Sequence, residues 1–316
     1  MPHKDCPGQL SGILVVDKPD GMTSHDVVSR ARKSLGMKKI GHAGTLDPFA
    51  TGILILLVGE GTKLSSYLME GRKTYLATVM LGEKRDTGDL SGEPIETAPF
   101  ENISLADVKS VLASFEGVIN QIPPMYSALK KNGVPLYKLA RKGVEVERKE
   151  REVLIESIRL VDFSLPRLEI EVTCSKGTYV RTLAEDIAAS LGSCGHLVKL
   201  RRTKSGSLSL EDAISLEDLA SRDRAIQAMT SLADSIATMP KIVVSAEGAD
   251  KIRTGAKLVA AWIEEYDLIK DPDDNMVRVL SLDGNLVSIC EILTDEREYG
   301  DLCADHEVGK SIRVFN

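Results

Sequence analysis

The chain has 316 residues, of which 43% are hydrophobic and 28% are charged; this composition is typical of a globular protein with a buried core. The length exceeds that of one average domain, so we expect two domains. We expect neither a signal peptide nor a membrane span, because no apolar run approaches the ~20 residues that a bilayer requires. The five cysteines form no C-x-x-C pair. This spacing argues against a zinc or disulfide framework and favours reduced thiols in a cytoplasmic protein.

The net charge of −7 at first argues against a nucleic-acid partner. The charge is unevenly distributed, because the segment from Lys241 onward contains 9 basic and 16 acidic residues, and the residues before it are neutral overall. Within that neutral part, Ala128–Arg151 has 8 basic against 3 acidic residues, and Lys176–Lys204 has 6 against 2. These two segments form either a phosphate-binding surface or two solvated faces, and charge alone does not decide between these alternatives.

Periodicity and capping residues predict the elements of the N-terminal part. Thr23-Ser24 is a typical helix N-cap, the apolar residues after it recur at helical spacing, and Gly36 ends the pattern. Apolar and β-branched runs between turn residues predict strands. The acidic stretch Glu83–Glu101, rich in Gly, Pro and Thr, is typical of a mobile insertion. In chain order we expect a strand at Gly12–Asp17, a helix at Thr23–Gly36, a loop at Gly41–Gly52, strands at Ile53–Val58 and Lys73–Leu81, and the insertion.

The remaining sequence continues this mixture and changes character near Pro240, where the acidic balance begins. The same patterns predict a helix starting at Ser104, strands at Arg151–Phe163 and Leu168–Ser175, a helix at Thr178–Leu191, strand and turn residues at His196–Leu210, a helix at Ser215–Ala233, and β-like runs at Met276–Leu282, Leu286–Leu293 and Ser311–Phe315. The regular βαβ rhythm of a parallel sheet is missing. We therefore predict an α+β fold, with a mixed, largely antiparallel sheet and flanking helices in residues 1–240 and a small β-rich domain in residues 241–316.

The loop Gly41–Gly52, with the sequence GHAGTLDPFATG, is the segment most suited to carry chemistry. Three glycines and one proline restrict it, and such loops hold side chains in place while a ligand approaches the backbone. Asp47 is its only carboxylate and His42 its only imidazole. Composition alone leaves two other interpretations open. Asp47 could simply start a turn, as Asp-Pro commonly does, and His42 could be an exposed surface residue without a function.

This loop resembles the signature loop of the bacterial tRNA pseudouridine-55 synthases, the TruB family. Other segments resemble further motifs of that family, in the family order, and together they cover most of residues 12–205. These segments are GILVVDKPDGMTSHDV at 12–27, Lys73-Thr74-Tyr75, QIPPMYSALKKNGVPLYKLAR at 121–141, GTYVRT at 177–182 and HLVKLRRT at 196–203. The resemblance implies an enzyme that isomerises uridine to pseudouridine in the T-loop of tRNA.

The resemblance also implies roles for single residues. The catalytic group is Asp47, and the motif arginine that pairs with it is Arg181. The side chains implied to contact the substrate are His42, which fills the gap left by the extracted nucleotide, Tyr75, which stacks on the base, the pocket tyrosine Tyr179 and the hydrophobic contact Leu200. Lys18-Pro19 is expected to have a mainly structural role.

Residue patterns alone leave alternatives open for three of these positions. Tyr75 alternates with apolar residues and fits a core strand. Arg181 could pair with Glu185 one helical turn later, which would contribute only a few tenths of a kcal/mol. Leu200 would be a core residue by default.

The implied reaction agrees with the residues present. It breaks the N1–C1′ bond, turns the uracil and joins C5 to C1′, without a redox step or energy input, so we expect no cofactor and no metal. The nucleotide must be flipped out of the folded RNA. Asp47 must be ionised to act, and a nearby Arg181 would favour the charged form. Whether Asp47 adds to C1′, adds to C6 or takes a ribose proton stays open.

Residues 241–316 resemble a small PUA-type RNA-binding domain, through Arg253-Thr254-Gly255 and the β run Val277–Leu293. The acidic balance of this segment opposes phosphate contacts, which dominate affinity for RNA. It would therefore either buttress the first domain or touch RNA with one narrow face. As partners we expect the T-arm of tRNA and no obligate protein, with the enzyme acting as a monomer.

Three other functions remain as alternatives at this stage. A non-catalytic tRNA-binding protein on the same scaffold would keep the basic segments and would not require Asp47. A guide-RNA-dependent relative of archaeal or eukaryotic type is disfavoured by the opening segment and by the acidic insertion. A glycosidase needs two carboxylates at a set spacing, and the loop Gly41–Gly52 has one.

Overall fold

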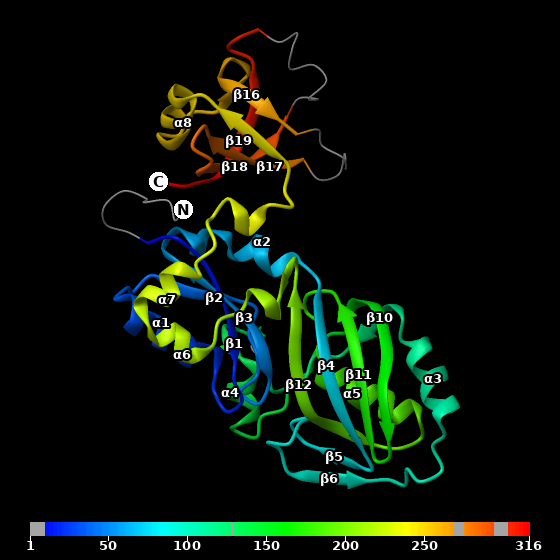
Figure 1. Cartoon of the computed structure of the whole chain (residues 1–316). Coiled ribbons are helices and arrows are strands. Elements are labelled where there is room, and N and C mark those ends of the chain that lie inside the picture. Colours follow the sequence, from blue (N-terminus) through cyan, green and yellow to red (C-terminus); the bar gives the residue numbers. More distant parts are fainter. Residues whose placement is uncertain (1–9, 128, 268–274, 294–302) are drawn as a thin grey trace.

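The computed structural model describes residues 10–127, 129–267, 275–293 and 303–316 (Figure 1). Its main sheet runs in the order β1-β3-β12-β4-β11-β10-β7, with β2 beside β3 and β13 beside β12. The strands are β1 (Gly12–Lys18), β2 (Ile40–Ala43), β3 (Thr51–Val58), β4 (Lys73–Leu81), β7 (Gly117–Gln121), β10 (Arg151–Ser164), β11 (Arg167–Cys174), β12 (Gly195–Ser205) and β13 (Leu208–Ser209). Among the described strands of this sheet, β3 and β12 are the one pair that runs in parallel. The predicted mixed, largely antiparallel α+β architecture is confirmed.

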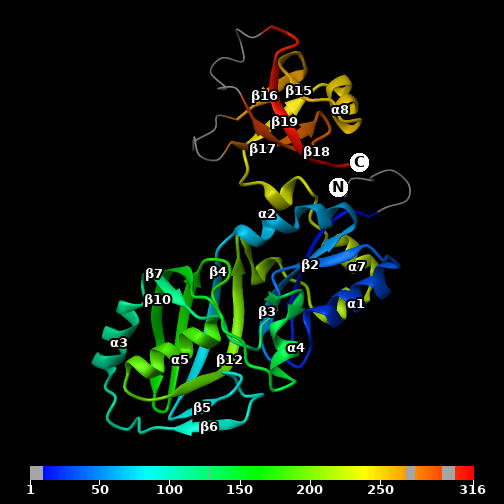
Figure 2. The ribbon, with the colours of Figure 1, turned by 180° about the vertical axis from the view of Figure 1, so that it is seen from behind.

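Capping residues set the ends of the main helices. Helix α1 (Ser24–Leu35) begins after a capping box formed by Thr23 and Asp26, and it ends at Gly36, whose φ of +68° lies in the left-handed region that favours glycine. Helix α3 (Leu105–Ser114) begins after a second capping box. Together with α5 (Val180–Ser190), these helices bury their apolar sides against the sheet in one hydrophobic core (Figure 2).

Three elements differ from the expectations. The expected loop Gly41–Gly52 begins inside β2, because its first residues pair with β3. The insertion Glu83–Glu101 contains a two-stranded sheet of β5 (Glu83–Arg85) and β6 (Pro94–Thr97). The helix expected at Ser215–Ala233 is interrupted at Ser221, whose extended backbone separates α6 (Leu216–Ala220) from α7 (Arg222–Gln227).

The patterns also missed several short elements. A two-residue strand, or a helix of five to eight residues, carries too little periodicity to be distinguished from a loop. These elements are α2 (Ser65–Glu70), β8 (Lys130–Lys131), β9 (Val134–Pro135), α4 (Leu136–Ala140) and, near the C-terminus, α8 (Ala246–Arg253).

The C-terminal part forms a second sheet with its own core. Its strands follow the order β15-β19-β18-β17-β14-β16. They are β14 (Lys241–Val244), β15 (Leu258–Val259), β16 (Ile263–Tyr266), β17 (Met276–Ser281), β18 (Leu286–Ile292) and β19 (Glu307–Val314). Helix α8 packs on this sheet. A separate apolar cluster joins the two parts, and Figure 1 shows that α2 lies between them. Among the described residues, no helix has the length and apolar character needed to cross a bilayer.

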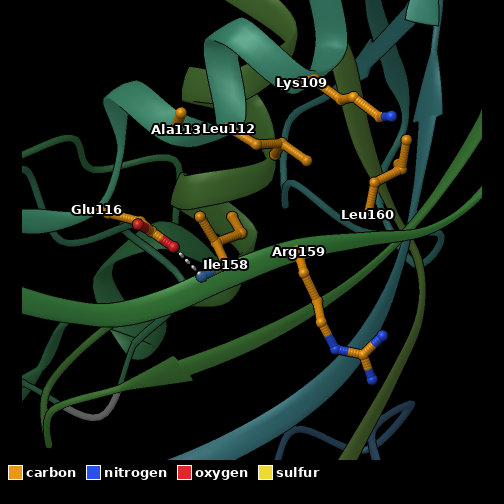
Figure 3. A pocket seen from close by; sticks show the side chains of 7 residues that line it. All are labelled: Lys109, Leu112, Ala113, Glu116, Ile158, Arg159 and Leu160. Atoms are coloured by element: carbon orange, nitrogen blue, oxygen red, sulfur yellow. Dashed lines mark hydrogen bonds between the residues drawn. The ribbon is translucent and has the colours of Figure 1, made fainter.

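A shallow pocket lies between α3 and β10 (Figure 3). Part of its wall is fixed by the Glu116 carboxylate, which accepts a hydrogen bond of 3.1 Å from the backbone N–H of Ile158. Three strands separate β10 from β3 in the sheet. The pocket is therefore remote from the loop that precedes β3, which carries Asp47.

Candidate active site

The loop that carries Asp47 is held by a buried serine of α1. The Oγ atom of Ser24, which is only 3% exposed, accepts from the N–H of Leu46 at 2.9 Å and donates to the carbonyl of the same residue at 3.1 Å. Leu46 is itself buried, and the N–H of Ala50 closes a turn onto the Asp47 carbonyl at 3.1 Å. The backbone on both sides of Asp47 is thus fixed.

A buried lysine holds the other side of the same loop. The Nζ atom of Lys18 donates to the carbonyls of Pro19, Met22 and Pro48, at 2.8, 2.6 and 3.0 Å. Burial lowers the pKa of Lys18 to about 8, while the charges of nearby carboxylates, Asp47 among them, act in the opposite direction. The Lys-Pro segment therefore ties β1 to the residue that follows Asp47 in the chain.

The side chain of Asp47 meets a buried arginine. The Nε atom of Arg181 lies 3.1 Å from Oδ2 of Asp47, and the two side chains are 5% and 36% exposed, respectively. The remaining donors of Arg181 are also used: Nη1 donates to the carbonyl of Thr87 at 2.9 Å and Nη2 to that of Tyr126 at 2.7 Å. An arginine held at this many points has a fixed orientation, and it presents one donor to a carboxylate that solvent can reach.

Arg181 has a second carboxylate partner, Asp89, which sequence reasoning missed. Oδ2 of Asp89 lies 3.3 Å from Nη1 of Arg181, and Asp89 is 3% exposed. The N–H of Leu197 on β12 donates to the carbonyl of Gly88 at 3.0 Å and anchors this part of the insertion. No ion pair between Arg181 and Glu185 is present in the described residues. In the sequence, Asp89 resembles any other residue of an acidic insertion, so only the fold identifies it.

Opposing influences act on the pKa of Asp47. Burial raises it most, the Arg181 guanidinium lowers it, and the Asp89 carboxylate raises it again. The net result is a pKa above the ordinary value for aspartate. Proximity to the arginine thus counteracts the protonation that burial alone would cause.

Tyr75 and Leu200 share one face of the main sheet. Strands β4 and β12 pair Tyr75 with Arg202 and Ala77 with Leu200, so these side chains project on the same side. Tyr75 is partly buried against the main core, and burial raises the pKa of its phenol. Leu200 is 7% exposed and belongs to that core. Its position fits a core residue, and its contact with the substrate stays a prediction.

Tyr179 stands at the start of α5 in a backbone clamp. The side-chain amide of Gln121 accepts from the N–H of Tyr179 at 2.8 Å and donates to its carbonyl at 3.1 Å. Gln121 is 2% exposed, and it opens the Q-x-P-P segment whose Tyr126 carbonyl holds Arg181. Burial raises the pKa of Tyr179. The clamp thus links two of the sequence motifs and positions the helix start that bears Arg181.

His42 lies on β2, opposite Leu56 of β3. Its Nδ1 atom is buried and has no hydrogen-bond partner among the described residues. Burial lowers the pKa of the imidazole, and the charge of Arg202 lowers it further. Both effects favour the neutral form of the ring. Within the described residues, no group of three or more His, Cys, Asp or Glu side chains forms a potential metal site.

Family models match most of the first 243 residues. A model described as "TruB family pseudouridylate synthase (N terminal domain)" matches residues 32–180, and one described as "tRNA pseudouridylate synthase B C-terminal domain" matches residues 181–243. The chain belongs to the TruB family. The resemblance found in the sequence motifs is thereby confirmed.

Individual proteins match between 71% and 97% of this chain. A tRNA pseudouridine synthase B of Geobacter sulfurreducens is 42% identical over 310 residues, which cover 97% of this chain and 100% of that protein. A protein of the same name from Bordetella pertussis is 48% identical over 225 residues, 71% of this chain and 92% of that one. A solved structure of a Cbf5-Nop10-Gar1 complex matches with a TM-score of 0.74 and 25% identity, covering 96% of this chain and 85% of that one.

The structure brings the TruB-derived positions together to different degrees. Asp47 and Arg181 are in direct contact. Tyr75 and Tyr179 lie close enough to Asp47 for its charge to affect the pKa of both phenols. His42 precedes the Asp47 loop on β2. Sequence reasoning did not single out three further residues that hold this arrangement, which are Asp89, Gln121 and Arg202.

Proposed function

We propose that this protein isomerises uridine to pseudouridine at position 55, in the T-loop of tRNA, with Asp47 as its catalytic group. The observation that carries the proposal is the 3.1 Å contact between Asp47 and the buried Arg181, in a member of the TruB family. It favours the charged form of an accessible carboxylate against the effect of burial and fixes its orientation, and every mechanism considered for this reaction requires a charged, oriented carboxylate. Membership in the family, together with the names of relatives up to 48% identical, supports the substrate.

The chemistry requires that the uracil be detached, turned and reattached while it stays in the site. The N1–C1′ bond breaks, C5 bonds to C1′, and the proton on C5 leaves. The carboxylate of Asp47 is the nucleophile or base for the first of these events, and the same geometry serves attack at C1′, attack at C6 or removal of a ribose proton. The hydroxyl of Tyr75 is our candidate for the group that helps to remove the proton from C5.

Flipping the nucleotide costs a few kcal/mol of unstacking, and three side chains are proposed to offset this cost. The neutral ring of His42 fills the space that the nucleotide leaves in the RNA. Tyr75 stacks on the extracted base, which recovers about 1–3 kcal/mol. Tyr179 and Leu200 complete the pocket. These roles follow from the family resemblance, and the burial and placement of the side chains are compatible with them.

We also propose different roles for the two parts of the chain. Residues 1–240 form the catalytic domain, and residues 241–316 form a PUA-like domain that buttresses it. Several cations of the second part are paired with acids, which reduces their capacity for phosphate; the pairs are Lys241–Glu265, Lys251–Glu247, Arg253–Asp250 and Lys257–Glu307. The enzyme acts in the cytoplasm as a monomer on the T-arm, with no obligate partner, metal or cofactor.

Incubation with unmodified tRNA, followed by mapping of pseudouridine at single-nucleotide resolution, tests the function. We expect one product, at the uridine that follows the T of the TΨC loop, and we expect the same product with a T-arm stem-loop. Absence of pseudouridine in both RNAs would refute the proposal. If whole tRNA reacts and the stem-loop does not, the second domain contributes to binding. Chelation and dialysis should leave turnover unchanged.

A further inference from the structure

Arg202 is a buried cation for which the proposed reaction has so far supplied no role. It is 1% exposed, and it is among the largest fully buried side chains of the protein. In the part of the chain that the structure describes, no carboxylate lies within ion-pair distance of it. Burying a charge without a counter-ion is costly. The cost of burying Arg202 without a counter-ion indicates that this residue has a role in addition to packing.

Backbone carbonyls at both ends of the Asp47 loop hold the guanidinium. Nε donates to the carbonyl of Ile53 at 2.7 Å, and Nη2 donates to that of Gly44 at 2.9 Å. Arg202 thereby fastens the start of β3 and the residue that follows β2. The charge is satisfied by oriented carbonyl dipoles, which leave it positive and fixed.

Glycines make room for this arginine at two points. Gly44 has a φ of +80°, and a Cβ atom there would lie 3.3 Å from Nη1 of Arg202. A Cβ atom on Gly52 would lie 2.2 Å from the carbonyl oxygen of Arg202, which no side chain can occupy. The glycine punctuation of the loop is thus partly explained by the close approach of Arg202.

Tyr75 is the cross-strand neighbour of Arg202. The two residues are paired between β4 and β12, so their side chains lie on one face of the sheet. Although burial raises the pKa of the phenol, the guanidinium acts against this rise. A fixed positive charge beside a phenol stabilises the ionised form of its oxygen, and the N–H groups that carry the charge favour hydrogen bonding to that oxygen.

We propose that Arg202 is a positioning residue for the isomerisation, which fixes the Tyr75 hydroxyl relative to the Asp47 loop and places a permanent positive charge beside it. This inference rests on the proposed function. Arg202 holds two backbone carbonyls at the ends of the Asp47 loop and is the cross-strand neighbour of Tyr75, so it lies between the two groups to which the proposed mechanism assigns chemistry. The same charge disfavours protonation of His42.

A double-mutant cycle tests this role. Arg202→Lys keeps the charge and loses the planar fork that reaches two carbonyls. We expect it to slow single-turnover product formation by about tenfold, within the range of coupling between contacting residues, and to have little effect in a Tyr75→Phe background. The affinity for tRNA should stay within about threefold, because Arg202 is buried and makes no phosphate contact.

Arg201→Lys is the matched control. Arg201 is the preceding residue on β12, its side chain projects to the other side and pairs with Asp17 at 2.7 Å, and its substitution should have the same small effect in both backgrounds. Equal losses from Arg202→Lys in both backgrounds would overturn the proposal, because a merely structural residue acts independently of the Tyr75 hydroxyl. If Arg202→Lys does not fold, Arg202→Gln, which keeps a side-chain donor and removes the charge, replaces it in the cycle.

A spectroscopic arm distinguishes this inference from the function on which it rests. Tyrosines are replaced by 3-fluorotyrosine, and the fluorine resonance of Tyr75 is assigned by its loss in Tyr75→Phe. We expect this resonance to move in Arg202→Lys and to stay in place in Arg201→Lys. An unmoved resonance would overturn the contact, even in an active enzyme. A moved resonance in a wild-type protein that forms no pseudouridine would refute the function and leave the contact standing.

Discussion

At the scale of residues, the site combines one accessible carboxylate with buried groups that control its charge and direction. Asp47 is reached from solvent, whereas Arg181 and Asp89 behind it are almost fully buried. Removing one member of a buried ion pair leaves an uncompensated charge and costs about 3–5 kcal/mol. The arrangement Asp47–Arg181–Asp89 therefore couples catalysis to stability, and conservative substitutions are the informative ones.

The pH dependence of the reaction should reveal the influence of Asp89. In the proposed mechanism the ionised form of Asp47 acts, so the single-turnover rate should fall as the pH drops through the raised pKa of this carboxyl. Asp89 contributes to that rise, so Asp89→Asn should move the acid limb of the rate–pH profile to lower pH. The plateau rate should also fall, because Arg181 loses a partner. Glu93→Gln, an exposed change in the same hairpin, is the control and should leave the acid limb of the rate–pH profile unmoved. An acid limb that moves to higher pH in Asp89→Asn would contradict the influence proposed for Asp89.

Two substitutions separate the possible functions of Tyr75. Tyr75→Phe keeps an aromatic face of similar size and should preserve tRNA affinity. It lacks the hydroxyl, so we expect steady-state turnover to fall by at least about 10²-fold, the lower end for a lost acid–base group. Tyr75→Leu should also bind the flipped nucleotide more weakly. Single-turnover product formation and tRNA affinity are measured for both; turnover of Tyr75→Phe within a few-fold of wild type would make Tyr75 a stacking residue only.

At the scale of elements, side chains connect the segments around the site. They form hydrogen bonds with backbone N–H and carbonyl groups of a neighbouring segment. Ser24 of α1 binds both backbone groups of Leu46, and Gln121 of β7 does the same for Tyr179 at the start of α5. The glycine-rich loop is therefore held by its neighbours. Its own sequence supplies the turn at Asp47 and space for Arg202.

The anchoring by Ser24 can be tested in isolation. Ser24→Ala leaves a buried N–H and a buried carbonyl of Leu46 without a partner, which should lower the free energy of unfolding by about 1–3 kcal/mol. A displaced loop should also slow single turnover by about 10²-fold, as small misplacements of reacting groups do. The matched control is Ser29→Ala, on the exposed side of α1, where the hydroxyl only donates to the carbonyl of His25. A wild-type single-turnover rate in Ser24→Ala would show that the loop keeps its conformation without Ser24.

Local patterns predicted the elements that local residues determine. The capping boxes of α1 and α3, the strand that carries Tyr75 and the loop that carries Asp47 could all be read from the sequence. Asp89 and Arg202 could not, because their importance arises from neighbours more than 90 residues away, such as Arg181 and Ile53. The break at Ser221 was missed because α6 and α7 contribute to the same core, so their combined pattern resembles one helix.

At the scale of the whole molecule, the C-terminal part is docked through α2, the 3-10 helix Gly59–Leu64 that leads into it, and the end of β19. Nζ of Lys63 donates to the carbonyl of Val314 at 2.8 Å and lies 5.6 Å from the ring centre of Phe315. Arg278 of β17 donates to the carbonyls of Ala233 and Met239. Because α2 leads into β4, the second sheet supports the strand that carries Tyr75, which fits the buttressing role proposed above.

Phe315 is the side chain whose removal should weaken this docking most directly. It is 2% exposed within the cluster that joins the two parts, so Phe315→Ala should lower stability by about 3–5 kcal/mol. Leu282→Ala, at a side chain that is 63% exposed, should change it by less than about 0.5 kcal/mol. Thermal unfolding of both variants is followed by calorimetry. Equal midpoints for the two would show that the apolar cluster does not hold the parts together.

The catalytic assignment of Asp47 is tested most directly by Asp47→Asn. This change removes the charge and keeps the size, and Arg181 retains Asp89 as a partner. Single-turnover formation of pseudouridine at position 55 and affinity for unmodified tRNA are measured side by side with the wild type. We expect the product to be undetectable and the affinity to stay within about threefold, because the proposed role is chemical and phosphate contacts dominate binding. Product formation above a thousandth of the wild-type rate, with pure variant protein, would contradict the assignment.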